Sequence, residues 1–84
     1  MAKEGKKVGI VTHFYDKLGV GIIKLEGPLK KGDHLKFEGH STNFDQVVSE
    51  MQFDHKDIDS GAKGKEVGIK LDDKVREGDK VYLV

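Results

Sequence analysis

Four histidines are the side chains of this 84-residue chain best suited to hold a metal ion: His13, His34, His40 and His55. Zinc sites use imidazoles from closely spaced positions, such as two histidines separated by three residues on a helix. No two of the four histidines have such a spacing, and each falls at a polar or outward position of an expected strand or turn. The sequence therefore predicts no metal site and no cofactor.

Hydrolytic chemistry would need a nucleophile held beside a base. Ser49, His55 and Asp57 supply the residue types of a hydrolytic triad, but Ser49 is expected on the inward face of its strand, and no nucleophile elbow surrounds it. Asp54, Asp57 and Asp59 could hold calcium, yet the EF-hand spacing and its closing glutamate are absent, so a solvated loop is expected. The chain also has no cysteine nucleophile. We therefore predict that it is not an enzyme.

Lysines form the remaining candidate site, because clustered positive charge is what contact with a phosphate backbone requires. Residues 1–42 carry eight lysines and five acids, whereas residues 43–84 carry seven basic and ten acidic side chains. The candidate RNA-binding residues are Lys6, Lys7, Lys17, Lys24, Lys30 and Lys31. The competing interpretation is that any lysine-rich hairpin makes an apparent patch, and the chain has a single arginine and few aromatic side chains for stacking on bases.

The elements that must position these residues follow a period of two, which is typical of half-buried strands. Six short alternating runs, separated by Gly- and Asp-rich turns, predict an all-β, small six-stranded closed or nearly closed β-barrel. The alternation slips by one residue near Ile22 and Ile23, which predicts a β-bulge there. The inward side chains expected from this pattern are Val8, Ile10, Val20, Ile22, Leu25, Leu35, Phe37, Val47, Met51, Phe53, Val67, Ile69, Val81 and Leu83.

Two turns of the chain are near copies. The segment 29–37 (LKKGDHLKF) aligns with 75–83 (VREGDKVYL), and in each a Gly-Asp pair opens an alternating strand. Glycine allows a positive φ, and an aspartate side chain can accept a hydrogen bond from a backbone N–H just downstream. We therefore expect both pairs to close tight turns rather than to carry chemistry.

Length and composition limit the possible classes of protein. A chain of 84 residues closes one core, so we expect a flexible tail over residues 1–5 and a single β-barrel domain over 6–84. Lys+Arg and Asp+Glu balance at 15 each, which excludes a polybasic binder. The absence of cysteine and of an apolar leader favours a cytoplasmic, non-membrane protein. Abundant lysine with few thermolabile residues fits a thermophile or, equally, an AT-rich genome.

Four motifs in order, over most of the chain, resemble the second, β-barrel domain of translational GTPases such as elongation factor Tu. They are 25–33 (LEGPLKKGD), 48–52 (VSEMQ), 62–71 (AKGKEVGIKL) and 75–79 (VREGD). The third motif has Lys65 where that family usually has a turn aspartate. No phosphate-binding G-x-x-x-x-G-K-[ST] loop is present, so this chain binds no nucleotide alone. It resembles a free-standing copy of the barrel, of the kind found as short elongation-factor-like proteins and at the C-terminus of collagenase-like peptidases.

Two functions follow as expectations from the resemblance and the lysines. The first is a non-catalytic binding module that contacts ribosomal or transfer RNA in translation. The alternative is a protein-binding adaptor barrel, similar to the barrel attached to collagenase-like peptidases. In both, the chain is expected to be a monomer whose partner is RNA or another protein.

Overall fold

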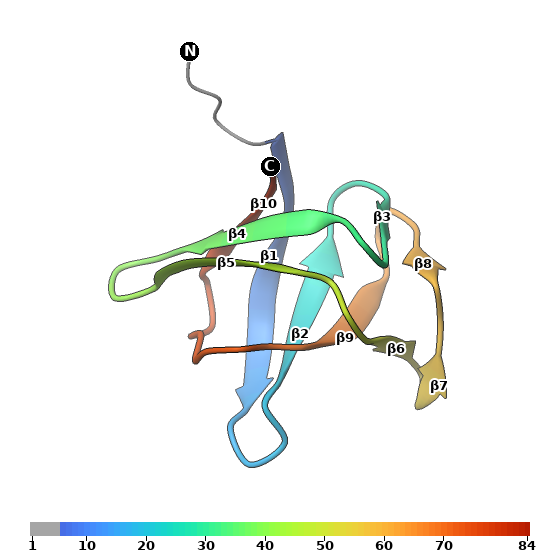
Figure 1. The fold of residues 1–84 in the computed structure, drawn as a ribbon, viewed down its shortest axis with the longest axis horizontal. Helices are drawn as coiled ribbons and strands as arrows, with labels where there is room; N and C mark the ends of the chain where they lie inside the picture. The colour runs from blue at the N-terminus through green and yellow to red at the C-terminus, as the bar shows by residue number, and fades with distance from the viewer. Residues whose placement is uncertain (1–5) are drawn as a thin grey trace.

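The computed structural model describes residues 6–84, and the predicted tail over residues 1–5 lies outside the described residues. This part of the chain contains strands, turns and loops but no helix, so the all-β prediction is confirmed (Figure 1). The strands are β1 (Lys6–Tyr15), β2 (Val20–Leu25), β3 (Leu29–Lys30), β4 (His34–Glu38), β5 (Asn43–Val47), β6 (Met51–Phe53), β7 (Lys56–Asp57), β8 (Ser60–Gly61), β9 (Glu66–Lys70) and β10 (Lys80–Leu83).

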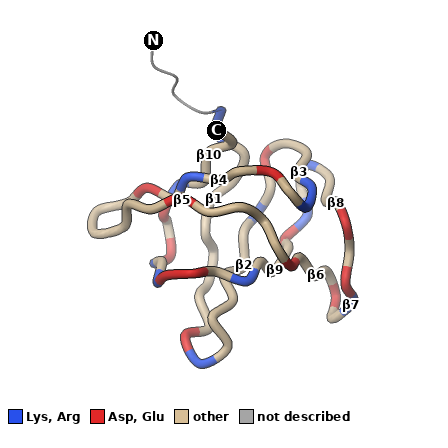
Figure 2. Tube along the Cα trace, in the orientation of Figure 1, with Lys and Arg blue, Asp and Glu red and all other residues tan. Residues whose placement is uncertain are grey.

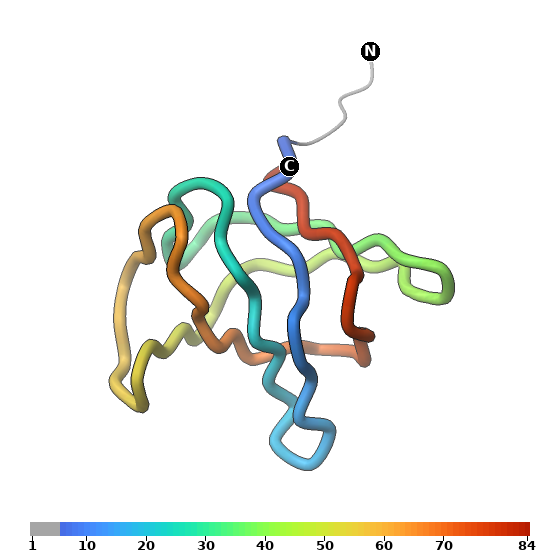
Figure 3. The backbone as a smooth tube through the Cα atoms, turned by 180° about the vertical axis from the view of Figure 1, so that it is seen from behind, coloured from blue at the N-terminus to red at the C-terminus, as the bar shows by residue number. Residues whose placement is uncertain are grey.

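Eight of these strands form one antiparallel sheet in the order β5-β4-β10-β1-β2-β9-β6-β7, and β3 pairs with β8 in a separate two-stranded sheet. The sheet curls, so that β4 and β5 cross in front of β1 and β2 (Figure 1), and Figure 3 shows the same arrangement from behind. The predicted barrel was closed or nearly closed, and the strand order does not return from β7 to β5, so the sheet is not closed. The strand count exceeds six because β3, β7 and β8 are two-residue pairings that periodicity cannot detect, and because the expected run from Val47 to Phe53 is divided between β5 and β6.

A side chain spans the gap at the edge of the sheet. Gln46, at the inward position of edge strand β5, donates from Nε2 to the Lys70 carbonyl at 2.8 Å. Its Oε1 accepts from the Asp72 backbone N–H at 2.7 Å. The amide of Gln46 therefore pairs with the end of β9 much as a neighbouring strand would, and it is only 6% exposed.

The core lies inside the curl of the sheet. Eight of the expected core residues are buried: Val8, Leu25, Leu35, Phe37, Met51, Val67, Ile69 and Val81. The prediction is wrong for Ile10, Val20, Ile22, Val47, Phe53 and Leu83, of which Phe53 and Leu83 still pack against the core from its margin. Six buried residues take their places: Val11, Ile23, Leu29, Val48, Leu71 and Val75.

A bulge in β1 explains why Val11 is buried in place of Ile10. The register shifts between Lys7 and Gly9 where β1 pairs with β10, and between Val11 and His13 where it pairs with β2. Each extra residue moves the following side chains to the opposite face, so Val8 and Val11 both point inward although they are three residues apart. The predicted bulge near Ile22 and Ile23 therefore lies on the strand facing them, and β2 itself alternates without interruption.

The repeated turns share one geometry, as the sequence repeat suggested. Gly32 and Gly78 have φ values of 91° and 93°, and the aspartate after each glycine accepts a backbone hydrogen bond. The donor lies three residues upstream of each aspartate, at Lys30 (3.0 Å) and at Arg76 (2.8 Å), and not downstream as expected. The aspartate side chain at the end of each turn therefore holds the first residue of that turn by a hydrogen bond.

Candidate functional site

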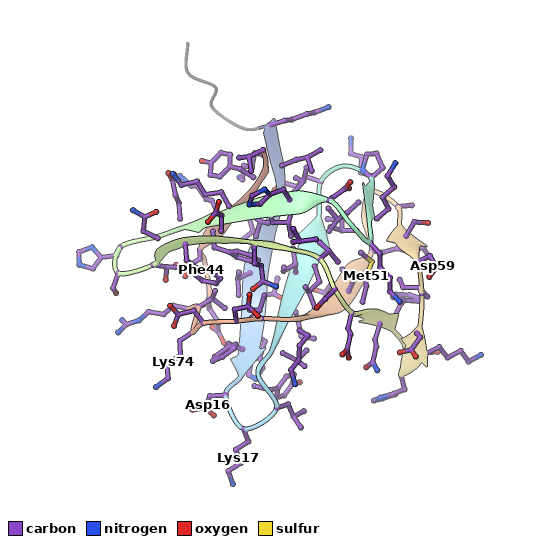
Figure 4. The ribbon with its side chains drawn as sticks, in the orientation of Figure 1. Asp16, Lys17, Phe44, Met51, Asp59 and Lys74 are labelled. Atoms are coloured by element: carbon purple, nitrogen blue, oxygen red, sulfur yellow. The ribbon has the colours of Figure 1, made fainter. Side chains whose placement is uncertain are left out.

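The structure does not bring the six candidate RNA-binding lysines together. Lys6 and Lys7 lie at the start of β1, whereas Lys17 lies at the tip of the β1–β2 hairpin, at the far end of that strand (Figure 4). Ten residues of strand span about 30 Å, so these lysines cannot contact one phosphate cluster. Lysines and acids alternate along the trace in Figure 2.

Acidic neighbours lie beside three of the candidate lysines: Lys7, Lys24 and Lys31. Lys7 Nζ lies 3.6 Å from Glu26 Oε2. Lys31 Nζ lies 3.7 Å from Asp59 Oδ1, a residue labelled in Figure 4. Lys24 pairs across strands with Glu66 on β9, and Lys30 is an exposed residue of β3. Local compensation of this kind weakens the potential that a phosphate backbone would need.

The histidines are separated in space as they are in sequence. His13 Nδ1 lies 3.3 Å from Glu77 Oε2, and His34 Nε2 lies 2.9 Å from Asp45 Oδ2. His40 lies in the exposed loop between β4 and β5, and His55 lies in the turn between β6 and β7 with a φ of 64°. Within residues 6–84, no three His, Asp or Glu side chains gather around a point that could hold an ion.

Ser49 is exposed, so its predicted inward position is wrong. Val48 takes the inward position, because the backbone leaves β5 after Val47 and does not resume strand pairing until Met51. In the described residues no hydrogen bond joins Ser49 to a histidine, so Ser49, His55 and Asp57 are not arranged as a triad.

A polar groove of about 910 Å³ lies between the β4–β5 loop and the turn before β10. Asp79 lies beneath it at 5% exposure, and its Oδ2 accepts hydrogen bonds from Thr42 Oγ1 and from the Arg76 N–H. A Cβ at Gly39 would overlap the Asp79 carboxylate, so the loop packs directly onto that side chain. Both donors are internal, and Asp79 therefore fastens the loop to β10 rather than facing a ligand.

The outer face of β1, β2 and β9 carries an apolar surface that sequence reasoning missed. Tyr15 and Leu18 are 47% and 62% exposed at the hairpin tip, and Val20 and Ile22 continue the surface along β2. Gly68 of β9 lies beside them, paired with Ile22. We call these five residues the outer apolar strip. The alternation of Val20 and Ile22 gave the correct period, but β2 continues without the expected bulge, so these two side chains lie on the face opposite to buried Ile23 and Leu25.

Gly68 makes the strip concave. A shallow hollow of about 260 Å³ lies over it, lined by Leu18, Val20, Glu50, Gln52, Gly68 and Lys70. A Cβ on Gly68 would stand 3.2 Å from Val20 Cγ1 and 3.5 Å from Ile22 Cδ1, so the missing side chain is what opens the floor. On the β1 side of the strip, opposite to Gly68 across β2, the rings of His13 and Tyr15 lie 4.3 Å apart between centroids. The strip thus combines aliphatic, aromatic and concave surface, which is the character of a recognition site.

Comparisons with known proteins point to peptidases. The chain is 44% identical over 79 residues to an uncharacterized protease of Methanocaldococcus jannaschii, covering 93% of this chain and 19% of that protein. It is 31% identical over 77 residues to a collagenase of Porphyromonas gingivalis, covering 89% of this chain and 21% of the collagenase. The chain therefore spans about a fifth of the length of these relatives. No family model matches it.

A solved structure has the same fold. The C-terminal domain of a Geobacillus thermoleovorans protein described as a U32 peptidase superimposes with a TM-score of 0.87, covering 100% of this chain and 99% of that domain at 17% identity. A selenomethionine variant of the same domain gives a TM-score of 0.86 at 18% identity, covering 95% of this chain and 99% of that one.

These findings correct the predicted resemblance. The interpretation as a translation-factor barrel, with a role in protein biosynthesis and RNA binding, is wrong, because the relatives are named as proteases and collagenases and the matching structure is a peptidase C-terminal domain. Among residues 6–84 there is also no helix long and apolar enough to cross a membrane. The chain has the fold of that C-terminal domain, and the relatives that its sequence matches are named as a protease and a collagenase.

Proposed function

We propose that the chain is a non-catalytic, polypeptide-binding module of a collagenase-like peptidase. The observation that carries this proposal is the match of nearly the whole chain to about a fifth of each protease relative, at 44% and 31% identity. A segment of that size leaves the other four fifths of each relative for peptide-bond hydrolysis. The module then contributes binding, the function that a small domain without a catalytic constellation can supply.

The side-chain arrangement supports the non-catalytic part of the proposal. Within the described residues, Ser49 has no base partner, and each of His13 and His34 contacts a single carboxylate on the surface. The most buried carboxylate, Asp79, uses its Oδ2 for internal hydrogen bonds. Catalytic groups are normally held close to one another in a cleft, and here they are dispersed.

The experiment that tests the proposal uses the Porphyromonas gingivalis collagenase in three forms: full length, lacking the segment that this chain matches, and with this chain in place of that segment. Gelatin and a short fluorogenic peptide serve as substrates. We expect the deletion to raise the KM for gelatin while sparing kcat on the short peptide, because binding remote from the reacting bond is lost. We expect the replacement to restore the gelatin KM.

Two results would contradict the proposal. The first is hydrolysis of either substrate by the 84-residue chain on its own. The second is a replaced enzyme that folds and cleaves the short peptide normally but handles gelatin no better than the deletion does. A truncated enzyme that misfolds would also handle gelatin poorly, so the deletion alone does not test the proposal. The replaced enzyme carries a folded domain at that position, and its KM for gelatin decides whether the module binds substrate.

A further inference from the structure

The outer apolar strip is narrow, which limits what can bind there. It runs over β1, β2 and β9, three neighbouring strands that together are about 10 Å wide. Folded partners bind through broader faces, of roughly 800 Å² on each side in a standard interface. A strip of this width instead suits a single extended polypeptide lying along β2.

The chemistry of the strip narrows the occupant further. Its floor is apolar and aromatic, formed by Val20, Ile22 and the contacting rings of His13 and Tyr15. Its margin carries side-chain donors that contact only exposed acceptors. Lys70 Nζ lies 3.4 Å from the Leu18 carbonyl, and Gln52 Nε2 lies 3.2 Å from Asp57 Oδ1. Both contacts are solvent-exposed and can exchange for contacts to a ligand.

We propose that the outer apolar strip binds a proline-rich polypeptide strand in the polyproline II conformation. Proline has no backbone N–H, so such a strand offers mainly carbonyl acceptors. The side-chain donors of Lys70 and Gln52 complement these acceptors. The carboxylate of Glu50, at the same margin, would find few N–H donors on the strand. Proline rings pack on aromatic and aliphatic grooves because the strand is already extended and loses little entropy on binding. The hollow over Gly68 takes one ring, and Tyr15 takes another.

The inference rests on the proposed function, because it names the class of polypeptide that the module would hold for the peptidase. Such strands, in which every third residue is glycine and proline is abundant, are what collagen becomes when its triple helix separates. The single-stranded form is the one proposed for the strip, because a separated strand exposes the proline rings and carbonyls that the strip would contact.

The test is a titration of the ¹⁵N-labelled 84-residue chain with a single-stranded Pro-Pro-Gly repeat peptide and with a Gly-Ser peptide of equal length. We expect amide shifts with the first peptide at Tyr15, Leu18, Val20, Ile22 and Gly68. We expect Gly68→Ala to weaken binding by about fivefold or more, because the new methyl group fills the hollow. The Cβ needs only a small adjustment of Val20, so thermal unfolding should confirm that the variant stays folded.

A matched pair of surface variants provides the control. Leu18 and Val47 are 62% and 51% exposed, and Leu18 lies in the β1–β2 turn whereas Val47 ends edge strand β5. Leu18→Asn should weaken peptide binding, whereas Val47→Asn should leave it within about twofold of the parent. Binding that survives Gly68→Ala and Leu18→Asn, equal shifts with the Gly-Ser peptide, shifts confined to the polar groove, or no binding at millimolar peptide would each overturn the inference.

The outcomes also separate this inference from the proposed function. If the replaced collagenase recovers its gelatin KM but the repeat peptide does not bind the strip, the module holds polypeptide elsewhere and only the inference fails. If the replaced enzyme does not recover, the proposed function fails. Dimerisation of the chain through the strip, seen as a doubled mass in sedimentation equilibrium that Leu18→Asn returns to the mass of the monomer, would make a second copy the occupant and would also overturn the inference.

Discussion

Gln46 shows how one side chain can complete a sheet that its backbone leaves open. Its amide has a donor and an acceptor at the spacing of a peptide group, and it uses both on the end of β9. Edge strands expose unpaired backbone groups that favour aggregation. By pairing with Lys70 and Asp72, Gln46 ties β5 to a segment that β5 does not reach through its own backbone.

The stability of the chain should therefore depend strongly on Gln46. We expect Gln46→Leu to lower the free energy of unfolding by roughly 1–3 kcal/mol, because the partly buried Lys70 carbonyl and Asp72 N–H lose their partner. Urea unfolding measures the change. Gln52→Leu is the matched control, since Gln52 bonds an exposed carboxylate, and it should change the stability by less than about 0.5 kcal/mol. Equal effects of the two substitutions would show that the bridge contributes nothing.

Two isoleucines, Ile22 on β2 and Ile69 on β9, test which face of the sheet is buried. Ile69 is fully buried, whereas Ile22 points to the outer face. Ile69→Ala should lower the free energy of unfolding by about 2–5 kcal/mol, because it leaves a cavity in a small core. Ile22→Ala should cost about 1 kcal/mol or less, because that side chain already contacts solvent. Guanidinium unfolding of both variants checks this order, and a reversed order would contradict the assignment of faces.

At the level of elements, three turns use the same glycine. Gly32, Gly64 and Gly78 have φ values of 91°, 92° and 93°, and in each turn the next residue's N–H bonds a carbonyl three residues before it. Two turns add an aspartate side chain that accepts from the backbone. The turn at Gly64 has Lys65 in that place, with its Nζ 4.5 Å from the centre of the Phe53 ring. The turn at Gly64 therefore has a cation–π contact in place of the hydrogen bond between an aspartate side chain and the backbone.

An aspartate at position 65 should form the same hydrogen bond from a backbone N–H to its side chain. Both Lys65→Asp and Lys65→Ala lose the cation–π contact, which contributes about 0.5–1 kcal/mol at an exposed site. The aspartate can also accept from the Ala62 N–H, so we expect Lys65→Asp to be the more stable variant by about 0.5–1.5 kcal/mol. Thermal unfolding compares the two. The same pair at exposed Lys63 controls for the change of charge, and a difference of equal size there would refute the explanation.

These elements also show how far the sequence alone reaches. Alternation located β4 and β9 and their inward side chains, and the two Gly-Asp turns were visible as a repeat. Alternation failed beside β1, because a bulge moves side chains between faces without changing the residue types along the strand. The outer apolar strip was hidden because a bulge was expected near Ile22 and Ile23, whereas β2 continues without one. Val20 and Ile22 resemble core residues until the register of the facing strand is known.

The whole molecule has a balanced and finely mixed surface charge. The chain carries 15 basic and 15 acidic residues. Lysines are in excess in the first half of the sequence, but the fold places acids from distant segments beside them, as Asp59 lies beside Lys31. Attraction to a polyanion depends on the summed field over a surface. A net excess along the sequence therefore gave a misleading picture, because folding brings the acidic second half beside the basic first half.

This surface predicts how the molecule responds to nucleic acid. We expect no change in fluorescence anisotropy when labelled transfer RNA is titrated with the chain at about 50 mM salt, a concentration at which phosphate contacts are strong. A lysine-rich peptide of similar length is the positive control. The variant with Lys24, Lys30 and Lys31 changed to Gln should behave like the parent, because acidic residues lie beside Lys24 and Lys31 and weaken the local potential. Saturable binding that weakens steeply with salt, and that the triple variant loses, would show that the lysines act together despite their separation.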